Sequence, residues 1–202
     1  HADSVENFMD DFGSALQYLR SLNSGGLPVH VMANSLGAVV TLNYFSRNQS
    51  AGIASLVLTT PGTHSTKEGD YSLFTKLAIL TAPADKYFRS PIRDEHFVDE
   101  GNFLDWIKDD PMSRRSFTAS FLRAVNKMKK DIGAKSASIN IPLFALTADK
   151  DAIIDNAAFE EEVFSTYSAK KELRTYDSKH YLYFGNDRDI VVSDIQDWIL
   201  SE

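Results

Sequence analysis

Four short runs of this sequence constrain the fold most, because they are apolar without the alternation of a half-exposed strand. They cover residues 28–33, 53–59 and 141–147, with 172–176 as a weaker fourth. A strand that is buried on one face alternates apolar and polar residues, whereas a strand covered on both faces does not. We therefore predict four strands of a buried, parallel sheet.

Helical patterns fill the intervals between these strands. Apolar residues recur every three or four positions over about 4–22, 36–47, 156–167 and 186–200. A helix that connects two neighbouring parallel strands forms a right-handed crossover, and successive crossovers place helices on both faces of the sheet. The predicted fold class is α/β.

Residues 61–138 interrupt this alternation. They contain helical stripes, clearest at 117–132, and many aromatic residues, but no further strand of the buried type. We predict a helical cap inserted over one end of the sheet, so that residues 1–60 and 139–202 form the core. The cap aromatics either pack against one another or form an apolar wall for a substrate.

The composition excludes several classes of function. The 202 residues include 21 Lys and Arg against 28 Asp and Glu, which gives a net charge of −7, and no cysteine. An acidic chain without a basic cluster is not expected to bind nucleic acid. Disulfides, thiolate zinc sites and cysteine nucleophiles are excluded. No apolar run reaches the roughly 20 residues of a membrane span.

The end of the first strand carries the candidate nucleophile. The sequence Ala33-Asn34-Ser35-Leu36-Gly37 joins strand to helix without a loop. Small residues two positions before and after Ser35 permit a sharp turn that exposes its side chain, and the helix start favours an anion there. Taken alone, such a match is more often a helix N-cap. Its place between a buried strand and an amphipathic helix favours a nucleophile elbow.

The later strand ends supply a base and an acid, which a serine nucleophile requires. His180 follows the last strand, and Asp149, Asp151 and Asp155 follow the strand before it. Ligand sites of parallel α/β sheets lie at this edge. We interpret the other histidines as packed (His30), structural or solvated (His64, His96) or terminal (His1), and Asp155 as a helix cap.

The order Ser35, Asp151, His180 is that of the α/β-hydrolases. The sequence resembles this superfamily and, within it, the monoacylglycerol lipase and lysophospholipase-like group. The resemblance covers nearly the whole chain, and it is carried by residues 1–11, the elbow at 31–37, Asp109-Asp110-Pro111, residues 141–155, Lys179-His180 and Asp197-Trp198-Ile199.

The resemblance implies a role for each site residue. Ser35 would be the nucleophile, His180 the general base and then acid, and Asp151 the partner that orients the imidazole, with Asp149 as its rival. The backbone N–H of Leu36 would stabilise the oxyanion. No metal and no organic cofactor is implied.

The function implied is a serine carboxylester hydrolase that forms an acyl-enzyme on a monoacyl lipid or a similar small ester. A thioesterase or an amidase of the same fold is an alternative, because the same residues serve those reactions. A non-catalytic fragment or scaffold that keeps the elbow is another. We disfavour a nucleotide-binding module, because no glycine-rich phosphate loop follows any strand.

Two departures from the family pattern stand out. Ala33 replaces the first glycine of the elbow, which small-residue packing tolerates. The early strands of the family, whose loop gives the second oxyanion donor, have no counterpart here. We therefore expect residues 29–33 to lie at a sheet edge, and a missing N-terminal segment to complete the sheet.

Overall fold

A four-stranded parallel sheet forms the centre of the fold in the computed structural model, which describes residues 4–48, 52–98 and 101–202. The strands are β1 (His30–Asn34), β2 (Ser55–Thr59), β5 (Leu143–Ala148) and β6 (Lys171–Tyr176), in the spatial order β1-β2-β5-β6. The register pairs Asn34 with Thr59 and Ala148 with Tyr176, so the strands end together at one edge. The four predicted strands and the α/β class are confirmed, but β6 lies at an edge and is only partly buried, so the prediction of a strand covered on both faces is wrong for residues 172–176.

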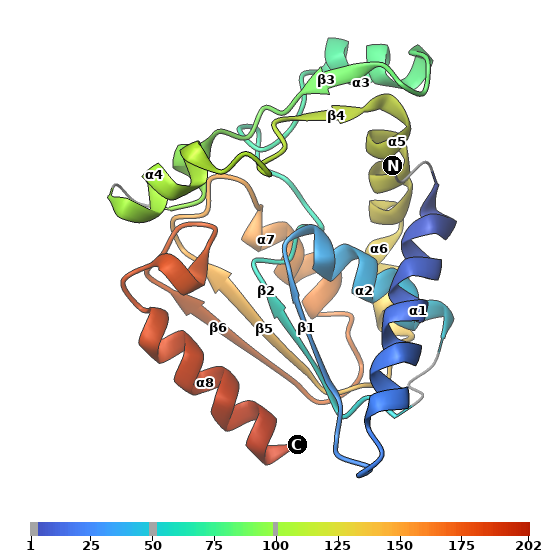
Figure 1. Cartoon of the computed structure of the whole chain (residues 1–202), viewed down its shortest axis with the longest axis vertical. Coiled ribbons are helices and arrows are strands. Elements are labelled where there is room, and N and C mark those ends of the chain that lie inside the picture. The colour runs from blue at the N-terminus through green and yellow to red at the C-terminus, as the bar shows by residue number, and fades with distance from the viewer. Residues whose placement is uncertain (1–3, 49–51, 99–100) are drawn as a thin grey trace.

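Helices cover both faces of the sheet (Figure 1). Leu56 and Leu58 pack on one face with α1 (Val5–Leu22), α2 (Leu36–Arg47), α6 (Ile132–Ala137) and α7 (Asn156–Phe159). Val57 points to the other face, where α8 (Arg188–Ser201) contributes Val191, Ile195 and Trp198. Because side chains alternate along a strand, one apolar run serves two cores. This accounts for the absence of polar alternation in the sequence.

The helices begin and end close to the predicted positions. The Ser4 side chain accepts a hydrogen bond from the Asn7 backbone N–H and so caps α1. Asp155 caps α7 in the same way, through the N–H of Ala158. This bears out its interpretation as a helix cap. The predicted helix at 156–167 is α7 followed by one π-helical turn at Glu160–Phe164.

The segment between β2 and β5 lies over the carboxyl ends of the strands, except for α6, which packs on a face of the sheet (Figure 1). It consists of α3 (Leu73–Thr81), β3 (Tyr87–Arg89), a 3₁₀ turn (Asp94–His96), α4 (Asn102–Asp109), β4 (Ser116–Thr118), α5 (Ala119–Lys129) and α6. The division of the chain into a core and a cap at 60/61 and 138/139 remains a prediction.

The stripe at 117–132 is not one helix. Phe117 belongs to β4, which pairs antiparallel with β3. Asp131 adopts a left-handed conformation (φ 57°) that separates α5 from α6. The apolar residues thus keep a helical spacing across two points where the helix is interrupted. The first interruption comes from the pairing of β4 with β3, and the second from the turn at Asp131.

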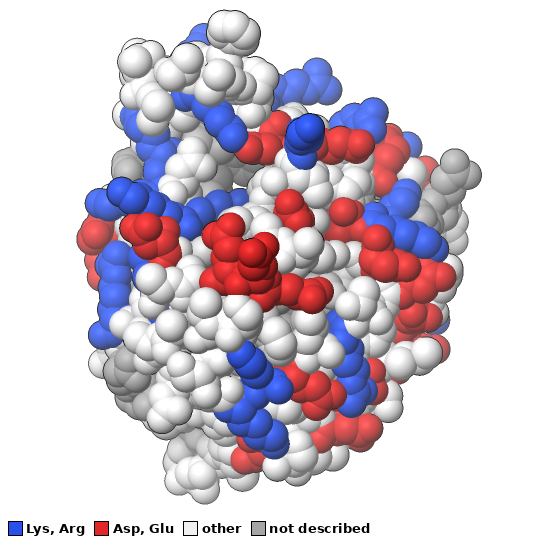
Figure 2. Space-filling model, turned by 180° about the vertical axis from the view of Figure 1, so that it is seen from behind, with Lys and Arg blue, Asp and Glu red and all other residues white. Residues whose placement is uncertain are grey.

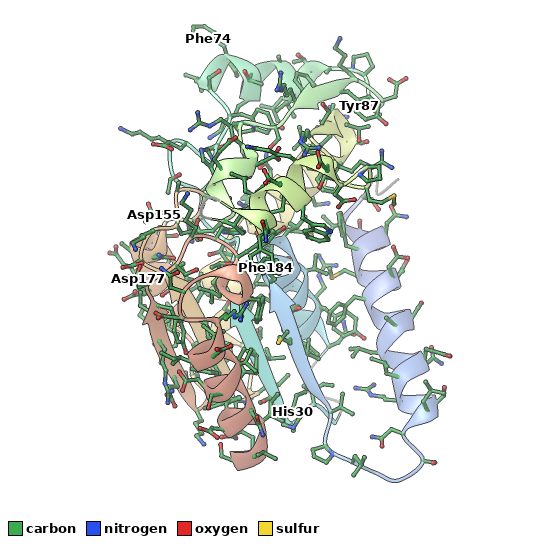
Figure 3. The ribbon with its side chains drawn as sticks, turned by 60° about the vertical axis from the view of Figure 1, so that its left-hand side comes forward. His30, Phe74, Tyr87, Asp155, Asp177 and Phe184 are labelled. Carbon is green, nitrogen blue, oxygen red and sulfur yellow. The ribbon has the colours of Figure 1, made fainter. Side chains whose placement is uncertain are left out.

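Apolar side chains point outward at the top of the segment. Phe74 and Tyr87 are 85% and 64% exposed, and Figure 3 shows both at the outer end of the molecule. The rear face carries interspersed charges of both signs with one central group of acidic residues (Figure 2). Among the described helices, none is long and apolar enough to cross a membrane.

β1 lies at an edge of the sheet within the described residues, as predicted for residues 29–33. The side chain of Met32 is 56% exposed, whereas Val31 and Ala33 on the other face are buried. α8 thus covers β2, β5 and β6 on this face and leaves β1 open. An edge strand with an exposed apolar side chain is a template for pairing.

Candidate active site

Ser35 occupies the turn between β1 and α2 in a strained conformation, with φ 51° and ψ −116°. A residue other than glycine holds a positive φ only where the surroundings enforce it, at about 1–3 kcal/mol. Ser35 stands at the N-cap position of α2, yet its side chain makes no capping hydrogen bond. The interpretation as a simple helix cap therefore does not hold, and the hydroxyl is left available for another use.

Backbone and side-chain contacts hold this turn against the end of β2. The Ser35 N–H donates to the Thr59 carbonyl (3.0 Å), and the Ser35 carbonyl accepts from the N–H of Gly62 (2.9 Å). The Asn34 amide donates to the hydroxyls of Thr59 (3.0 Å) and Thr60 (3.1 Å). The two strand ends are thereby tied together on either side of Ser35.

Gly62 is a part of the site that the sequence analysis missed. A Cβ at this position would lie 2.8 Å from the Ser35 carbonyl carbon and 3.0 Å from the Leu36 nitrogen. Only glycine allows the chain to approach the elbow this closely. The Pro61-Gly62 dipeptide directly after a buried strand was the signal that could have indicated it.

Asp151 and His180 form a buried pair at the carboxyl ends of β5 and β6. The Nδ1 atom of His180 lies 2.8 Å from Oδ2 of Asp151, and both side chains are at most 1% exposed. An ionised carboxylate can only accept, so Nδ1 carries the hydrogen and Nε2 is left as an acceptor. The second oxygen of Asp151 accepts from the N–H groups of Ile153 (2.8 Å) and Ile154 (3.1 Å), which fixes the carboxylate.

The loop that carries His180 is held by the segment over the sheet. The N–H of Tyr181 donates to the Phe97 carbonyl (2.8 Å), and the ring of Phe97 stands edge-on to the imidazole at 5.6 Å. Lys179 donates to the carbonyls of Glu95 (3.0 Å) and Val98 (3.2 Å). These contacts between distant parts of the chain have no local signal in the sequence.

The other candidate acid, Asp149, and the other described histidines do not take part in the pair formed by Asp151 and His180. Asp149 accepts from the Ser178 N–H (3.2 Å) and makes no hydrogen bond to a histidine among the described residues. His64 pairs with Glu162 (3.0 Å), and His96 is buried beside Arg93. His30 contacts Ser55 (2.8 Å) and lies at the opposite end of the sheet from Phe184 of the last loop (Figure 3).

No hydrogen bond joins Ser35 to His180 within the described residues. The two belong to the same edge of the sheet, and Tyr183 of the His180 loop reaches Thr59 beside the elbow (3.4 Å). In unliganded enzymes such bonds are often long and tighten when substrate binds. The structure thus pairs Asp151 with His180 and places Ser35 on the same edge.

Two adjoining cavities open at this edge. One, of about 210 Å³, is lined by Ser35, Leu36 and Gly62 together with residues of α5. We call it the Ser35 cavity. The other, of about 350 Å³, is lined by Phe97 and Tyr181 next to His180. The two have the lining residues Ser90, Ile92 and Phe117 in common, so they lie next to each other.

Phe117 lines both cavities and also stacks on Phe121 at 5.0 Å, so one aromatic of the segment takes part both in a cavity wall and in aromatic packing. Burial raises the pKa of the Tyr181 hydroxyl, so this group stays protonated.

In the described part of the chain, no cluster of three or more His, Asp or Glu could hold a metal ion.

Comparison with solved structures shows the same fold at low sequence identity. The monoacylglycerol lipase of Paleococcus ferrophilus superimposes with a TM-score of 0.85 at 16% identity, over 98% of this chain and 76% of that one. A soluble variant of the monoglyceride lipase of Saccharomyces cerevisiae gives 0.83 at 17%, over 95% and 68%. A carboxyl esterase of Bacillus coagulans gives 0.64 at 15%, over 95% and 70%.

No curated protein sequence matches the chain significantly. Residues 1–187, by contrast, match the family described as serine aminopeptidase, S33. This match spans the elbow, the Asp151 turn and the His180 loop, and the resemblance to the α/β-hydrolases is confirmed. The chain belongs to the serine aminopeptidase S33 family and is a serine hydrolase of the α/β-hydrolase fold.

Proposed function

We propose that the protein hydrolyses carboxylic esters through an acyl-enzyme on Ser35. The observation that carries the proposal is the buried hydrogen bond between Asp151 and His180, at the sheet edge where Ser35 sits in a strained turn without a capping bond. These are the nucleophile, base and orienting acid that acyl transfer requires.

The first half of the reaction forms the acyl-enzyme. Nε2 of His180 takes the hydroxyl proton of Ser35 as Oγ attacks the ester carbonyl carbon, and the carbonyl oxygen becomes an oxyanion. The N–H of Leu36, at the start of α2, stabilises this oxyanion. The tetrahedral intermediate collapses, the alkoxy group takes the proton from His180, and the alcohol leaves.

Water completes the cycle. His180 removes a proton from a water molecule, and the resulting hydroxide attacks the acyl carbon. When the second intermediate collapses, Oγ of Ser35 regains the proton and the acid is released. Asp151 keeps the proton on Nδ1 throughout and stabilises the imidazolium, without itself becoming protonated.

The apolar walls of the cavities support an ester with one apolar chain. The Ser35 cavity is lined by apolar residues from three parts of the chain: Ile92, Phe117, Phe121, Leu122, Val125, Ile153 and Ile154. Two of the most similar solved folds are those of monoacylglycerol lipases, which supports a monoacyl lipid as the substrate class. The volumes favour a chain that extends from one cavity into the other.

A second candidate is an amidase. The family description, serine aminopeptidase, favours it, and the same three residues cleave amides by the same steps. An ester and the anilide of the same acid distinguish the two. We expect turnover of the ester to exceed turnover of the anilide by orders of magnitude; comparable kcat/KM values would favour the amidase.

Labelling with a fluorophosphonate tests the nucleophile directly. We expect peptide mapping to place the label on Ser35, and Ser35→Ala to lower turnover by on the order of 10⁶. Ser21→Ala, on the exposed side of α1, is the matched control and should change neither. A label on another serine, or activity that survives Ser35→Ala, would refute the assignment. A stable protein that takes no label would instead support the non-catalytic scaffold.

The open edge of β1 supports a further element of the proposal. A strand that pairs with β1 would cover Met32 and satisfy the outward-facing backbone groups of the edge. We propose that a segment completing the sheet lies there in the working enzyme and brings the second oxyanion donor. Reconstitution with such a segment should raise kcat by about 10²–10³. Unchanged kcat would contradict it.

A further inference from the structure

The Ser35 cavity has a polar end that the acyl-transfer mechanism does not use. Lys129 near the end of α5, Asn126 one turn earlier, and Ser65, Asp70 and Tyr71 from the segment after β2 line it. Asp70 and Lys129 are the charged residues among those lining the cavity.

Lys129 is a partly buried cation that forms no ion pair among the described residues. Its ammonium group donates to Oγ of Ser65 (3.1 Å), and no carboxylate of the described residues lies within 4 Å of it. Burial lowers its pKa to about 8, with a smaller raising effect from Asp70 and a smaller lowering effect from Lys76. The group is therefore still charged at neutral pH, and a buried unpaired charge is costly unless something balances it.

Asp70 cannot balance this charge alone, because its carboxylate is already committed. One oxygen forms an ion pair with Lys76, and the other accepts from the Tyr71 N–H (2.7 Å). Lys76, Asp70 and Lys129 together carry one net positive charge beside the cavity. The surplus cation is Lys129, which lines the cavity.

Tyr71 adds a second unused donor. Its hydroxyl is buried and has no hydrogen-bond partner among the described residues. Burial and, to a lesser degree, Asp70 raise its pKa to about 12, so the hydroxyl stays protonated and able to donate. Buried polar groups in native proteins are nearly always satisfied, and Tyr71 is also one of the residues that line the Ser35 cavity.

We propose that the Lys129 and Tyr71 end of the Ser35 cavity binds an anionic group, a carboxylate or a phosphate, carried by the ester substrate. The inference deepens the proposed function and rests on it, because it places the anion in the cavity that Ser35 lines. An anion accepts from the Lys129 ammonium group and cancels the surplus charge. A neutral polyol would accept from the same group but leave this charge unbalanced.

The size of the cavity limits the substrate further. A volume of about 210 Å³ holds few atoms beyond the ester itself, so the anionic group lies close to the scissile bond. Two substrate designs satisfy this: a short dicarboxylic acid esterified at one end, or an acylated glycerol whose alcohol part carries a phosphate.

Matched substrates and variants test the inference. One pair is 4-nitrophenyl hexanoate and mono-4-nitrophenyl adipate, which differ by a carboxylate on the acyl part; the other is 1-lauroylglycerol and its 3-phosphate. In Lys129→Met we expect the ratio of kcat/KM for the anionic to the neutral ester to fall at least tenfold in one pair. The pair that responds identifies whether the anion belongs to the acyl or to the alcohol part.

Lys127→Met is the control, since Lys127 lies on the same helix, is exposed and does not line the Ser35 cavity. Its ratios should stay within twofold of the unmodified protein in both pairs. Ratios for Lys129→Met that also stay within twofold in both pairs would overturn the inference, as would an equal fall in Lys127→Met.

A binding measurement separates this inference from the proposed ester hydrolysis. Calorimetric titration with adipate and with inorganic phosphate needs no turnover, and we expect the Kd of one of them to rise at least tenfold in Lys129→Met only. If binding responds while no ester is hydrolysed, the subsite stands and the proposed function fails. If neither ligand binds the unmodified protein, the subsite is refuted whatever the activity.

Discussion

Replacing Gly62 by alanine tests whether the close approach of this glycine to the elbow matters for activity. The added Cβ would lie 2.8 Å from the carbonyl carbon of Ser35, 2.9 Å from its carbonyl oxygen and 3.0 Å from the nitrogen of Leu36. Ordinary van der Waals contact begins at 3.4 Å, and all three neighbours are backbone atoms that no rotamer change can move. The elbow must therefore shift by about half an ångström.

Two effects set the expected magnitude. A misplacement of about 1 Å in a catalytic group typically lowers the rate by roughly 10²-fold, so half of that shift predicts about a tenfold loss. Obstruction of the Leu36 N–H adds part of the roughly 10²–10³-fold loss that follows removal of an oxyanion donor. We expect kcat/KM to fall between about 10- and 10³-fold, and the overpacked turn to lose about 1–3 kcal/mol of unfolding free energy.

Gly37→Ala is the matched comparison, although Gly37 belongs to the elbow motif and Gly62 does not. A Cβ at Gly37 would meet only the Cβ of Ala33 at 3.7 Å, which is an ordinary contact. Inside α2, alanine is also favoured over glycine by about 0.5–1 kcal/mol. We expect activity within about threefold of the unmodified protein and equal or higher stability.

Hydrolysis of a short-chain aryl ester, the rate of fluorophosphonate labelling and thermal unfolding measure the three effects separately. A Gly62→Ala variant that keeps kcat/KM within threefold would refute the argument that the backbone at this position shapes the elbow. Greater damage from Gly37→Ala than from Gly62→Ala would show that the motif glycine, and not the packing beneath it, controls the geometry.

Three further outcomes follow from the same structure. Asp151→Asn should lower kcat by about 10⁴ by stabilising the wrong imidazole tautomer, and Asp149→Asn by far less, with steady-state kinetics on one ester deciding the order. Lys129 has a pKa of about 8 in the fold and 10.5 as its ordinary value, so the unfolded chain binds more protons between these pH values and stability rises there. Lys129→Met removes this titrating group. The difference in unfolding free energy between the variant and the unmodified protein, measured in urea, should therefore shrink by on the order of 3 kcal/mol between pH 7 and pH 10.5. A constant difference would contradict the burial of the charge. Met32→Lys should suppress self-association measured by light scattering, because a charge on an open edge strand disfavours strand pairing with a second molecule. Unchanged scattering would show that this edge does not cause the self-association.

The strands and the sheet-edge residues were predictable because their signals are local. A strand buried on both faces shows a continuous apolar run, and parallel strands end at one edge whatever connects them. Ser35 and Asp151 follow two such runs, and His180 follows the weaker run at 172–176, which forms an edge strand, so their common edge could be predicted from the sequence. The bond between Asp151 and His180 supports the preference over Asp149, and the catalytic roles of all three remain predictions.

The segment over the sheet was less predictable, because its conformation depends on pairing between distant residues. Phe117 fits a helical stripe by spacing, but its backbone pairs with the distant Phe88, and this pairing makes it a strand. Lys129 belongs by its local sequence to a basic stretch that indicates a solvated helix end, and only the fold places it at the Ser35 cavity. Gly62 had a local signal in the Pro61-Gly62 dipeptide, but its contact with the elbow also comes from the fold.

The segment between β2 and β5 also does more than cover the site. Its carbonyls at Glu95, Phe97 and Val98 accept hydrogen bonds from Lys179 and from the N–H of Tyr181, the residues on either side of His180. The proposed base, His180, is therefore positioned by the same segment whose helix α5 contributes Phe121 and Lys129 to the Ser35 cavity. A change in the packing of this segment alters the placement of the imidazole and the shape of the cavity together. We therefore expect selectivity and rate to be coupled through this segment, which also places Gly62 against the elbow.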